Sequence, residues 1–489
     1  MPLLPPALPL VMLAMLLPCA ITVLDDNQQR EQPFVGRTAD GDLLLQGDTD
    51  GRVLLNGIDL LGELRTAYAQ LEEGAVQLHA VQRRLQAREA QLPALRARVC
   101  LLSLGNSSGE LTLAPVQDIP TTGARASRSF RIGGTLYLVV ANSHDDMMNY
   151  NINSAIYRWD GNRFIHFQYI RTAGAVSWTA FTVDSTPFLV VANRYNGTSY
   201  EINSATYRWD GTMFVHHQDI PTLAASGWAA FEAEGAVFLA VANNRVDNST
   251  RLANGLLGSV VYRWNGTSFA RIRNEMLESA ATGLSAFTMD GQLYLAMTDE
   301  MDLVGDRRID STVYQWISGP PLGLFQRYQN IPTIGAANVQ PFTVGGVQYL
   351  AFANHYNGFT HNIDSYIYRY EEGVGFDMMQ SLATRGAADW EFFRVNGVAH
   401  LAVANQVEDR DGASTPDGNP SYLTTSTVFR WDDGAEAFEP WLEIPTAGAS
   451  DWETFTINGT QYLVVANSFD GESYNTTSRV YTLSHACQG

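Results

Sequence analysis

Short hydrophobic runs separated by polar turns recur along most of this chain, at a spacing of about 50–60 residues. The most regular run is Leu136-Tyr-Leu-Val-Val-Ala-Asn142, and six variants of it end at Asn193, Asn243, Asp299, Asn354, Asn405 and Asn467. Apolar runs of this length, bounded by Asp-Gly, Asn-Gly or Gly-Gly turns, predict buried β-strands. The pattern therefore indicates seven tandem repeats between about Leu111 and Ser484.

Three further strand patterns recur with the same spacing. One opens with a serine in every copy and leads into Tyr-Arg-Trp-Asp-Gly or a variant of it: Ser154, Ser204, Ser259, Ser311, Ser365, Ser426 and Ser478. Another ends in Ile-Pro-Thr-x-Gly or a near variant, as at Ile119, Ile220, Ile331 and Ile444. The last joins a tryptophan to a phenylalanine, and we expect its tryptophans to pack between blades: Trp178, Trp228, Trp390 and Trp452.

Four strands per repeat are typical of one propeller blade, and seven blades can close a ring without leaving sheet edges exposed. The predicted fold class is therefore all-β, a seven-bladed β-propeller of four-stranded blades over residues 111–484. Repeat four departs most from the pattern, because Thr298-Asp299 replaces Ala-Asn and Gln315-Trp316 replaces Arg-Trp.

The two ends of the repeat array are complementary. The seventh repeat stops at Ser484 without an outer strand, whereas a spare strand, residues 111–117, precedes the first repeat. We expect the spare strand to complete the last blade. Cys100 and Cys487 lie just outside the two ends, and a disulfide between them would stabilise the ring by about 3–5 kcal/mol in the chain-entropy model. Pairing of Cys100 between neighbouring chains is the alternative.

The region before the repeats has a different periodicity. Apolar residues return every seven positions at Leu64, Leu71, Leu78, Leu85, Leu92 and Val99. This heptad pattern predicts a coiled-coil helix over residues 58–100, and hence a homo-oligomeric stalk that displays the propeller multivalently. A single amphipathic helix lying on the propeller is the alternative reading. Residues 25–57 hold two Asp-Gly turns beside four-residue apolar runs, which predict a short strand and turn segment.

The first 24 residues are apolar and place the small residue Ala20 near their end, as expected of a signal peptide. We therefore expect a secreted, extracellular protein. The alternative is that these residues are an uncleaved N-terminal membrane anchor. Six Asn-x-Ser/Thr sequences fit the secretory route as N-glycosylation sites: Asn106, Asn196, Asn248, Asn265, Asn458 and Asn475.

The formal net charge of −20 argues against a nucleic-acid partner and against binding to anionic membranes. The repeats also carry no residue set typical of catalysis. Seven equivalent serines are not seven nucleophiles, and we expect them to satisfy backbone groups. The histidines lack zinc-ligand spacing, and no phosphate-binding loop or nucleophile elbow occurs. We therefore predict a protein that is not an enzyme, with no catalytic residues and no metal or cofactor.

The loops after each Ala-Asn differ most between repeats, and function commonly resides in such loops. We expect them to share one face of the propeller and to gather aromatic binding anchors there: Tyr150, Tyr195, Tyr200, Tyr356, Phe359, Phe469 and Tyr474. Packing of these side chains on neighbouring loops is the alternative. Calcium is a further possibility, because the same loops hold Asp145-Asp146, Asp306 and Glu408-Asp-Arg-Asp411.

The Tyr-Leu-Val-Val-Ala-Asn, Ser-x-Ile-Tyr-Arg-Trp-Asp-Gly and Ile-Pro-Thr-x-Gly-Ala sequences resemble epilepsy-associated repeats, also called EAR or EPTP repeats. This resemblance covers the propeller and implies a secreted protein that binds a cell-surface receptor or a matrix protein. The N-terminal region resembles neither leucine-rich repeats nor a laminin-G-like domain, so the resemblance names no receptor. A lectin-like, glycan-binding propeller is the alternative function.

Overall fold

A computed structural model describes residues 34–37, 43–46, 54–55, 58–59, 111–244, 258–276, 281–302, 304–319, 323–409 and 420–485. Contacts divide the chain into two compact units, residues 1–95 and 96–489. In the first unit, β1 (Phe34–Arg37) pairs with β2 (Leu43–Gln46) and β3 (Leu54–Leu55) with β4 (Ile58–Asp59), both antiparallel. The predicted signal peptide, the heptad helix from Leu60 onwards and all three cysteines lie outside the described residues.

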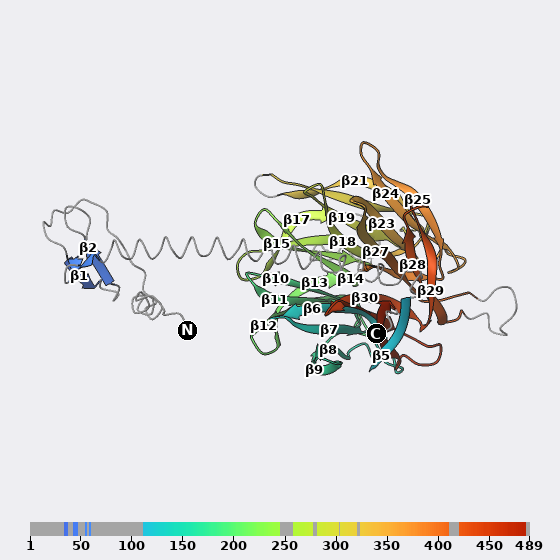
Figure 1. Cartoon of the computed structure of the whole chain (residues 1–489), viewed down its shortest axis with the longest axis horizontal. Coiled ribbons are helices and arrows are strands. Elements are labelled where there is room, and N and C mark those ends of the chain that lie inside the picture. The colour runs from blue at the N-terminus through green and yellow to red at the C-terminus, as the bar shows by residue number, and fades with distance from the viewer. Residues whose placement is uncertain are drawn as a thin grey trace, which may run out of the picture. The chain divides into compact units, whose positions relative to one another are not determined.

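The second unit contains seven four-stranded antiparallel sheets (Figure 1). The innermost strands are β6 (Ala124–Ile132), β10 (Ala175–Val183), β14 (Ala225–Ala233), β18 (Ala281–Met289), β22 (Ala336–Val344), β26 (Ala387–Val395) and β30 (Ala449–Ile457). The second strands are β7 (Thr135–Asn142), β11 (Thr186–Asn193), β15 (Ala236–Asn243), β19 (Gln292–Asp299), β23 (Val347–Asn354), β27 (Val398–Asn405) and β31 (Thr460–Asn467). The third strands are β8 (Asn153–Trp159), β12 (Glu201–Trp209), β16 (Ser259–Trp264), β20 (Asp310–Ile317), β24 (Asp364–Glu371), β28 (Leu423–Asp432) and β32 (Thr477–His485). The outer strands are β9 (Phe164–Arg171), β13 (Phe214–Leu223), β17 (Phe269–Met276), β21 (Leu324–Pro332), β25 (Gly375–Ala383), β29 (Ala437–Ala447) and β5 (Leu111–Pro120). The prediction of an all-β, seven-bladed propeller is confirmed.

The last blade contains strands from both ends of the propeller. Strand β5 pairs antiparallel with β32, from Pro120 opposite Thr477 to Leu111 opposite His485. Figure 1 shows β5 beside the C-terminal end of the chain. The spare strand before the first repeat therefore completes blade seven, as predicted, and the ring is closed by backbone hydrogen bonds.

The hydrophobic core lies between adjacent blades. Trp228 packs against Val190 and Ala192 of the preceding blade, and Trp452 packs in the same way against Ala402. All four repeat tryptophans are buried. The apolar second strands supply most of the remaining core because both faces of each blade are covered by neighbouring blades. The prediction that these tryptophans form the core between blades is confirmed.

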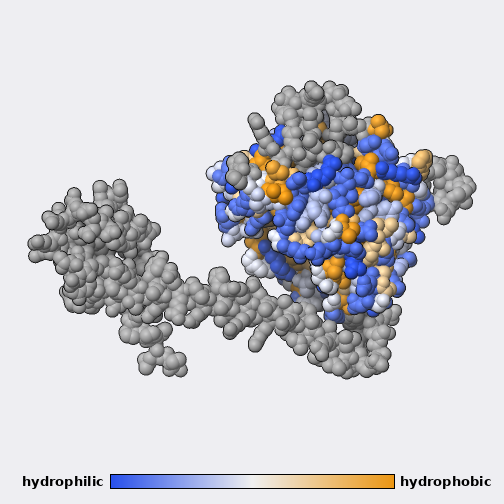
Figure 2. All heavy atoms as spheres, turned by 90° about the horizontal axis from the view of Figure 1, so that it is seen from above, coloured by the Kyte–Doolittle hydropathy of each residue, from blue (hydrophilic) through white to orange (hydrophobic). Residues whose placement is uncertain are grey.

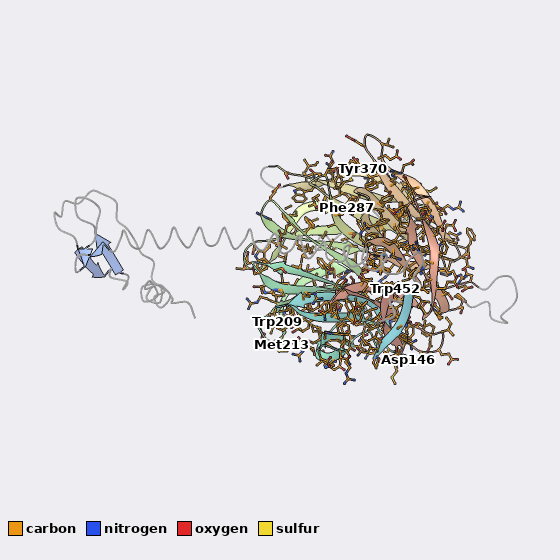
Figure 3. The ribbon with its side chains drawn as sticks, viewed as in Figure 1. Asp146, Trp209, Met213, Phe287, Tyr370 and Trp452 are labelled. Carbon is orange, nitrogen blue, oxygen red and sulfur yellow. The ribbon has the colours of Figure 1, made fainter. Side chains whose placement is uncertain are left out.

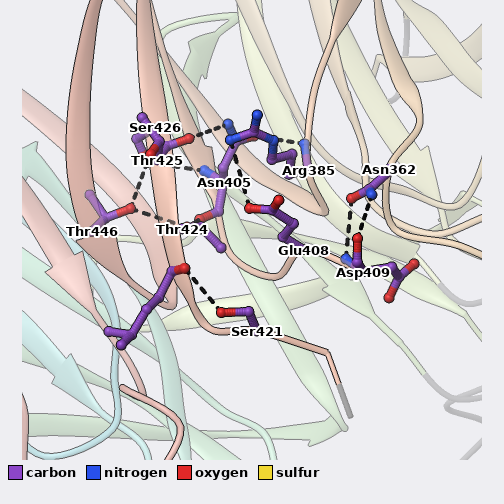
Figure 4. A network of polar contacts seen from close by, with 11 residues as sticks. Asn362, Arg385, Asn405, Glu408, Asp409, Ser421, Thr424, Thr425, Ser426 and Thr446 are labelled. Carbon is purple, nitrogen blue, oxygen red and sulfur yellow. Dashed lines mark hydrogen bonds and ion pairs between the residues drawn. The ribbon is translucent and has the colours of Figure 1, made fainter. Parts of the chain in front are cut away.

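The recurring serines hold the ends of the strands together. Each serine hydroxyl accepts the backbone N–H of the Asn or Asp that ends the second strand of its blade, at 3.0–3.4 Å in all seven blades. In six of them the hydroxyl also lies 2.8–3.0 Å from a threonine hydroxyl. Figure 4 shows this network around Asn405, Ser426 and Thr446. These contacts confirm the structural role predicted for the serines.

The outer surface of the second unit is mostly hydrophilic on the face shown in Figure 2, with hydrophobic residues scattered over it. Within the part of the chain that the structure describes, no helix has the length and apolar character required to cross a membrane.

Candidate binding face

Two sets of loops meet on one face of the propeller, which we call the loop face. One set follows the second strand of each blade. The other set connects the outer strand of one blade to the innermost strand of the following blade. They are joined by hydrogen bonds of 3.0–3.2 Å, in which the residue after the Asn donates its N–H to the carbonyl of the residue before the innermost strand, as from Ser143 to Gly123 and from His355 to Gly335. Figure 3 places Asp146, of this face, at the opposite end of the propeller from Met213.

The glycines before the innermost strands make this close approach possible. Gly335 has a φ of +50°, and an added Cβ would overlap the carbonyl oxygen of Tyr356. A residue with a side chain is strained in this conformation. Where glycine ends the Ile-Pro-Thr-x-Gly sequence, it therefore lets the loop from the preceding blade lie against the loop that follows the second strand, whereas Ala224 takes this place in blade three with a φ of +49°.

The aromatic side chains of the loop face form pairs within each loop and across the seams between blades. Within loops, the ring centroids of His144 and Tyr150 lie 4.8 Å apart, and those of Phe469 and Tyr474 lie 4.5 Å apart. Across seams, Tyr474 lies 4.1 Å from His144, and Tyr150 lies 4.8 Å from Tyr195. We call the continuous series the aromatic arc: Tyr422, Phe469, Tyr474, His144, Tyr150, Tyr195 and Tyr200.

Five of the seven aromatic residues predicted as binding anchors belong to the arc. Tyr356 lies elsewhere on the face, where it stacks on His361 at 4.4 Å and lies 5.0 Å from the Arg307 guanidinium carbon. Only Phe359 is largely exposed, at 89%. Five of the seven side chains contact a residue of a neighbouring loop, and Tyr200 stacks on Tyr195 of its own loop. The sequence reasoning missed His144, which shares its loop with Tyr150, and Tyr422, which lies in the loop between β27 and β28 where no anchor was predicted.

The most exposed large apolar side chains of the described residues gather on the same face. Met147, Val304 and Phe359 are 90%, 89% and 89% exposed, and each follows the second strand of a different blade. The next most exposed is Val374, at 67%, in the turn between β24 and β25 at the other end of blade five. These three side chains lie on blades one, four and five of the loop face, and each is available there to contact a partner.

Four of the six predicted glycosylation sites lie in described turns and loops, whereas Asn106 and Asn248 lie outside the described residues. Asn265 and Asn458 are exposed in hairpin turns. Asn196 and Asn475 lie on the loop face, and the Asn475 Nδ2 donates to Asp146 at 2.8 Å. A glycan on Asn475 would therefore compete with a contact between blades seven and one.

Four carboxylates on the innermost strands join neighbouring blades, a feature that the sequence reasoning did not identify. Asp451 Oδ2 accepts the Ser127 N–H at 2.8 Å, and Glu453 Oε1 accepts the Ser129 N–H at 2.9 Å across the closing seam. Asp389 and Glu391 make the equivalent bonds to the N–H groups of β30, at 3.2 and 3.1 Å. The signal in the sequence is Asp-Trp-Glu, which occurs in repeats six and seven only.

One cation faces this group: Arg128 lies 3.0 Å from Glu453. Burial raises the pKa of Asp389 to about 7. Burial and the facing carboxylates also raise the pKa of Glu391 and Asp451 well above the usual range, although Arg128 acts in the opposite direction. The four carboxylates thus hold the blades together as hydrogen-bond acceptors, at an electrostatic cost that depends on pH.

We expect the free energy of unfolding of Asp389→Asn, relative to that of the wild type, to increase as pH rises from 5 to 8. An acid whose pKa is raised by folding destabilises the folded protein progressively between its unfolded pKa of 3.8 and its folded pKa of about 7. Asparagine removes this charge and keeps an oxygen that accepts the Trp452 N–H. The measurement is the free energy of unfolding in urea at several pH values, with EDTA present.

Asp432→Asn is the matched control. Backbone N–H groups of Ala435 and Gly434 lower the pKa of Asp432, so this group stays ionised across the range tested. Its effect should therefore stay constant from pH 5 to pH 8. The prediction would be contradicted if the free energy of unfolding of Asp389→Asn minus that of the wild type stayed constant or decreased as pH rises.

The acidic loop residues considered for calcium are engaged in local contacts. Asp145 Oδ1 accepts the N–H groups of Met147 and Asn149, and Glu408 lies 3.7 Å from Arg385. Asp411 lies outside the described residues. Over the described ranges, no group of three or more His, Cys, Asp or Glu side chains is arranged to hold a metal ion.

The seven-bladed ring and its converging loops define a propeller of the kind built from tandem repeats. A family model of the EPTP domain matches six segments, which together cover more than half of the chain: residues 112–160, 163–210, 213–265, 324–371, 375–432 and 437–483. The chain belongs to the EPTP-repeat family, as the sequence resemblance indicated. The stretch between residues 265 and 324 falls outside these matches and includes the divergent Thr298-Asp299 of repeat four.

Two relatives carry the same repeats. The chain is 32% identical over 281 residues to the mouse "Thrombospondin-type laminin G domain and EAR repeat-containing protein", covering 47% of this chain and 41% of the relative. It is 36% identical over 282 residues to the human protein of that description, again covering 47% and 41%. The chain thus matches less than half of the length of these curated relatives.

Proposed function

We propose that this propeller is a secreted, non-enzymatic binding protein whose loop face contacts a cell-surface receptor or a matrix protein. The observation that carries the proposal is that the three most exposed large apolar side chains of the described residues, Met147, Val304 and Phe359, all lie on the loop face. Membership of a family of repeat propellers supports the same function. The recurring serines, which would be the candidate nucleophiles, are committed to backbone and threonine contacts in the described blades.

We expect Phe359→Ala to weaken binding of the secreted protein to intact cells by about tenfold or more, as truncation of an exposed aromatic anchor does. Phe359 is suited to this test because its ring is largely exposed. Its loss should leave the thermal stability unchanged. The measurement is a cell-binding titration by flow cytometry, combined with a melting curve for each variant.

Val374→Ala is the matched control, since Val374 is an exposed apolar residue of the same blade on the opposite face. It should bind cells as the wild type does. Equal binding by wild type, Phe359→Ala and the double variant Met147→Ala/Phe359→Ala would contradict the proposed face. Loss of binding after enzymatic deglycosylation of the cells, with no effect of Phe359→Ala, would favour the glycan-binding alternative.

We also propose that the heptad segment that follows β4 (Ile58–Asp59), up to Cys100, forms a coiled-coil stalk that displays several propellers together, and that Cys100 and Cys487 form a disulfide within one chain. The heptad spacing supports the stalk, and the pairing of β5 with β32 supports the disulfide because it joins the segments next to the two cysteines. A monomer in sedimentation experiments would contradict the stalk. Covalent oligomers on a non-reducing gel would contradict the disulfide.

A further inference from the structure

A small hollow of about 100 Å³ opens on the loop face where blades six, seven and one meet. Its lining contains no carboxylate and consists of Gly123, Arg125, His144, Gln406, Tyr422, Ser468, Phe469 and Tyr474. Its polar side chains can all donate hydrogen bonds: a guanidinium, an amide, two phenols and the Ser468 hydroxyl, which donates to Gly448, beside an imidazole. The walls between them are aromatic rings of the arc.

Arg125 is the central cation of this hollow. Burial and the neighbouring Arg194 lower the pKa of Arg125, and the structure gives it no ion pair within the described residues. The acidic residue that follows the second strand of blade four, Glu300, is already bound to Arg307 at 2.6 Å. Arg125 is only partly exposed to solvent, and a guanidinium in such a place without a counter-charge is less favourable than one that a ligand carboxylate pairs with.

Two further side chains of the hollow have unused hydrogen-bonding capacity. His144 is 6% exposed, and its Nε2 has no hydrogen-bond partner in the part of the chain described here. Gln406 uses its Oε1 to contact His355 Nε2 at 3.1 Å. Burial lowers the pKa of His355 to about 4, so this neutral ring donates to Gln406 and leaves the Gln406 amide nitrogen available as a donor.

We propose that the hollow binds the carboxylate of one aspartate or glutamate side chain of the partner protein, with Arg125 as its counter-ion and Gln406 as a second donor. The planar guanidinium matches a carboxylate with two parallel hydrogen bonds. The volume of about 100 Å³ suits a carboxylate and its methylene groups and is smaller than a typical pocket for a whole small-molecule ligand. This inference rests on the proposed function, because it assumes a protein bound at the loop face.

The test uses the full-length protein and two small probes, N-acetyl-aspartate amide and its neutral analogue N-acetyl-asparagine amide, in ligand-observed NMR titrations. We expect the acid to bind at least about tenfold more tightly than the amide, and Arg125→Gln to remove that preference. Arg163→Gln, at an exposed arginine of the turn between β8 and β9, should leave it unchanged. Equal binding of both probes to the wild type would overturn the proposal.

Gln406→Glu is a second variant, which tests the same proposal if Arg125→Gln fails to fold. The new carboxylate would lie in the hollow with Arg125 and would still accept from His355, so the protein should melt no lower than the wild type while losing the acid probe. Binding of the acid probe by folded Gln406→Glu would overturn the proposal. Tighter binding of the methyl glycoside of N-acetylneuraminic acid than of the aspartate probe would assign the carboxylate to a sialylated glycan instead.

Binding to intact cells separates this proposal from the proposed function. We expect Arg125→Gln to weaken cell binding at least about tenfold, as Phe359→Ala does. If Phe359→Ala weakens cell binding and Arg125→Gln does not, the loop face binds its partner without the hollow, and the carboxylate site is wrong while the proposed function stands. If neither variant changes cell binding while Arg125 still binds the acid probe, the proposed face fails instead.

Discussion

A chain that starts at Gly123 should fail to fold cooperatively, whereas one that starts at Gly105 should fold. The shorter chain lacks β5, so β32 loses its partner along its whole length and blade seven exposes a strand edge. Exposed strand edges promote aggregation, and the ring loses the backbone strand pairing that joins its two ends. The measurements are urea unfolding and size-exclusion chromatography of both chains.

A transplanted strand provides the control. His485 lies opposite Leu111, so residues 111–120 appended after His485 through a short glycine-containing turn would form the same antiparallel pair. All other blades already have this connection from their third to their outer strand. The appended strand should restore cooperative unfolding to the shorter chain. Cooperative unfolding of the shorter chain without it, at the midpoint of the longer one, would show that β5 is dispensable.

Replacing Trp452 with alanine should lower the free energy of unfolding by about 3–5 kcal/mol, as large-to-small changes of buried aromatic residues do. Trp452 is 1% exposed and packs between blades six and seven, next to the seam that β5 closes. Its indole Nε1 also donates to the Val403 carbonyl at 3.0 Å. Urea unfolding at a fixed pH measures the loss.

Two phenylalanine variants distinguish the hydrogen bond from the packing. Trp390 is buried as deeply as Trp452, but its Nε1 has no hydrogen-bond partner among the described residues. Trp452→Phe should therefore be more destabilising than Trp390→Phe by about 1 kcal/mol, the usual net contribution of one hydrogen bond. Equal losses would mean that the indole hydrogen bond contributes nothing to stability.

The fold was predictable because each blade repeats the same physical solution. A serine at the start of the third strand, an asparagine at the end of the second and a glycine before the innermost strand recur, and each makes the same hydrogen bond wherever the structure describes it. The closure by β5 was predictable from the missing outer strand of the last repeat. A single apolar run of eight residues could be either a strand or a buried helix segment. Its repetition between turns in seven copies identifies it as a strand.

The site was less predictable because it depends on differences between repeats. Sequence identifies Tyr150 and Tyr195 as loop aromatics but does not show that they lie 4.8 Å apart across a seam, because that distance depends on how neighbouring blades pack. The lack of a carboxylate beside Arg125 was also invisible, since it depends on which side chains of three acidic loops, far apart in the chain, line the hollow. Phe359, in contrast, was correctly placed among the loop aromatics.

The closing strand also determines when the propeller is completed during synthesis. Thr121, directly after β5, hydrogen-bonds Ser478 of β32, which lies 357 residues later in the chain. At ribosomal rates of 5–20 residues per second, roughly 20–70 s pass before the partner of β5 exists. During that interval the first strand of the ring is made but unpaired, so the final blade is the last to form and the early strand must be kept from pairing elsewhere.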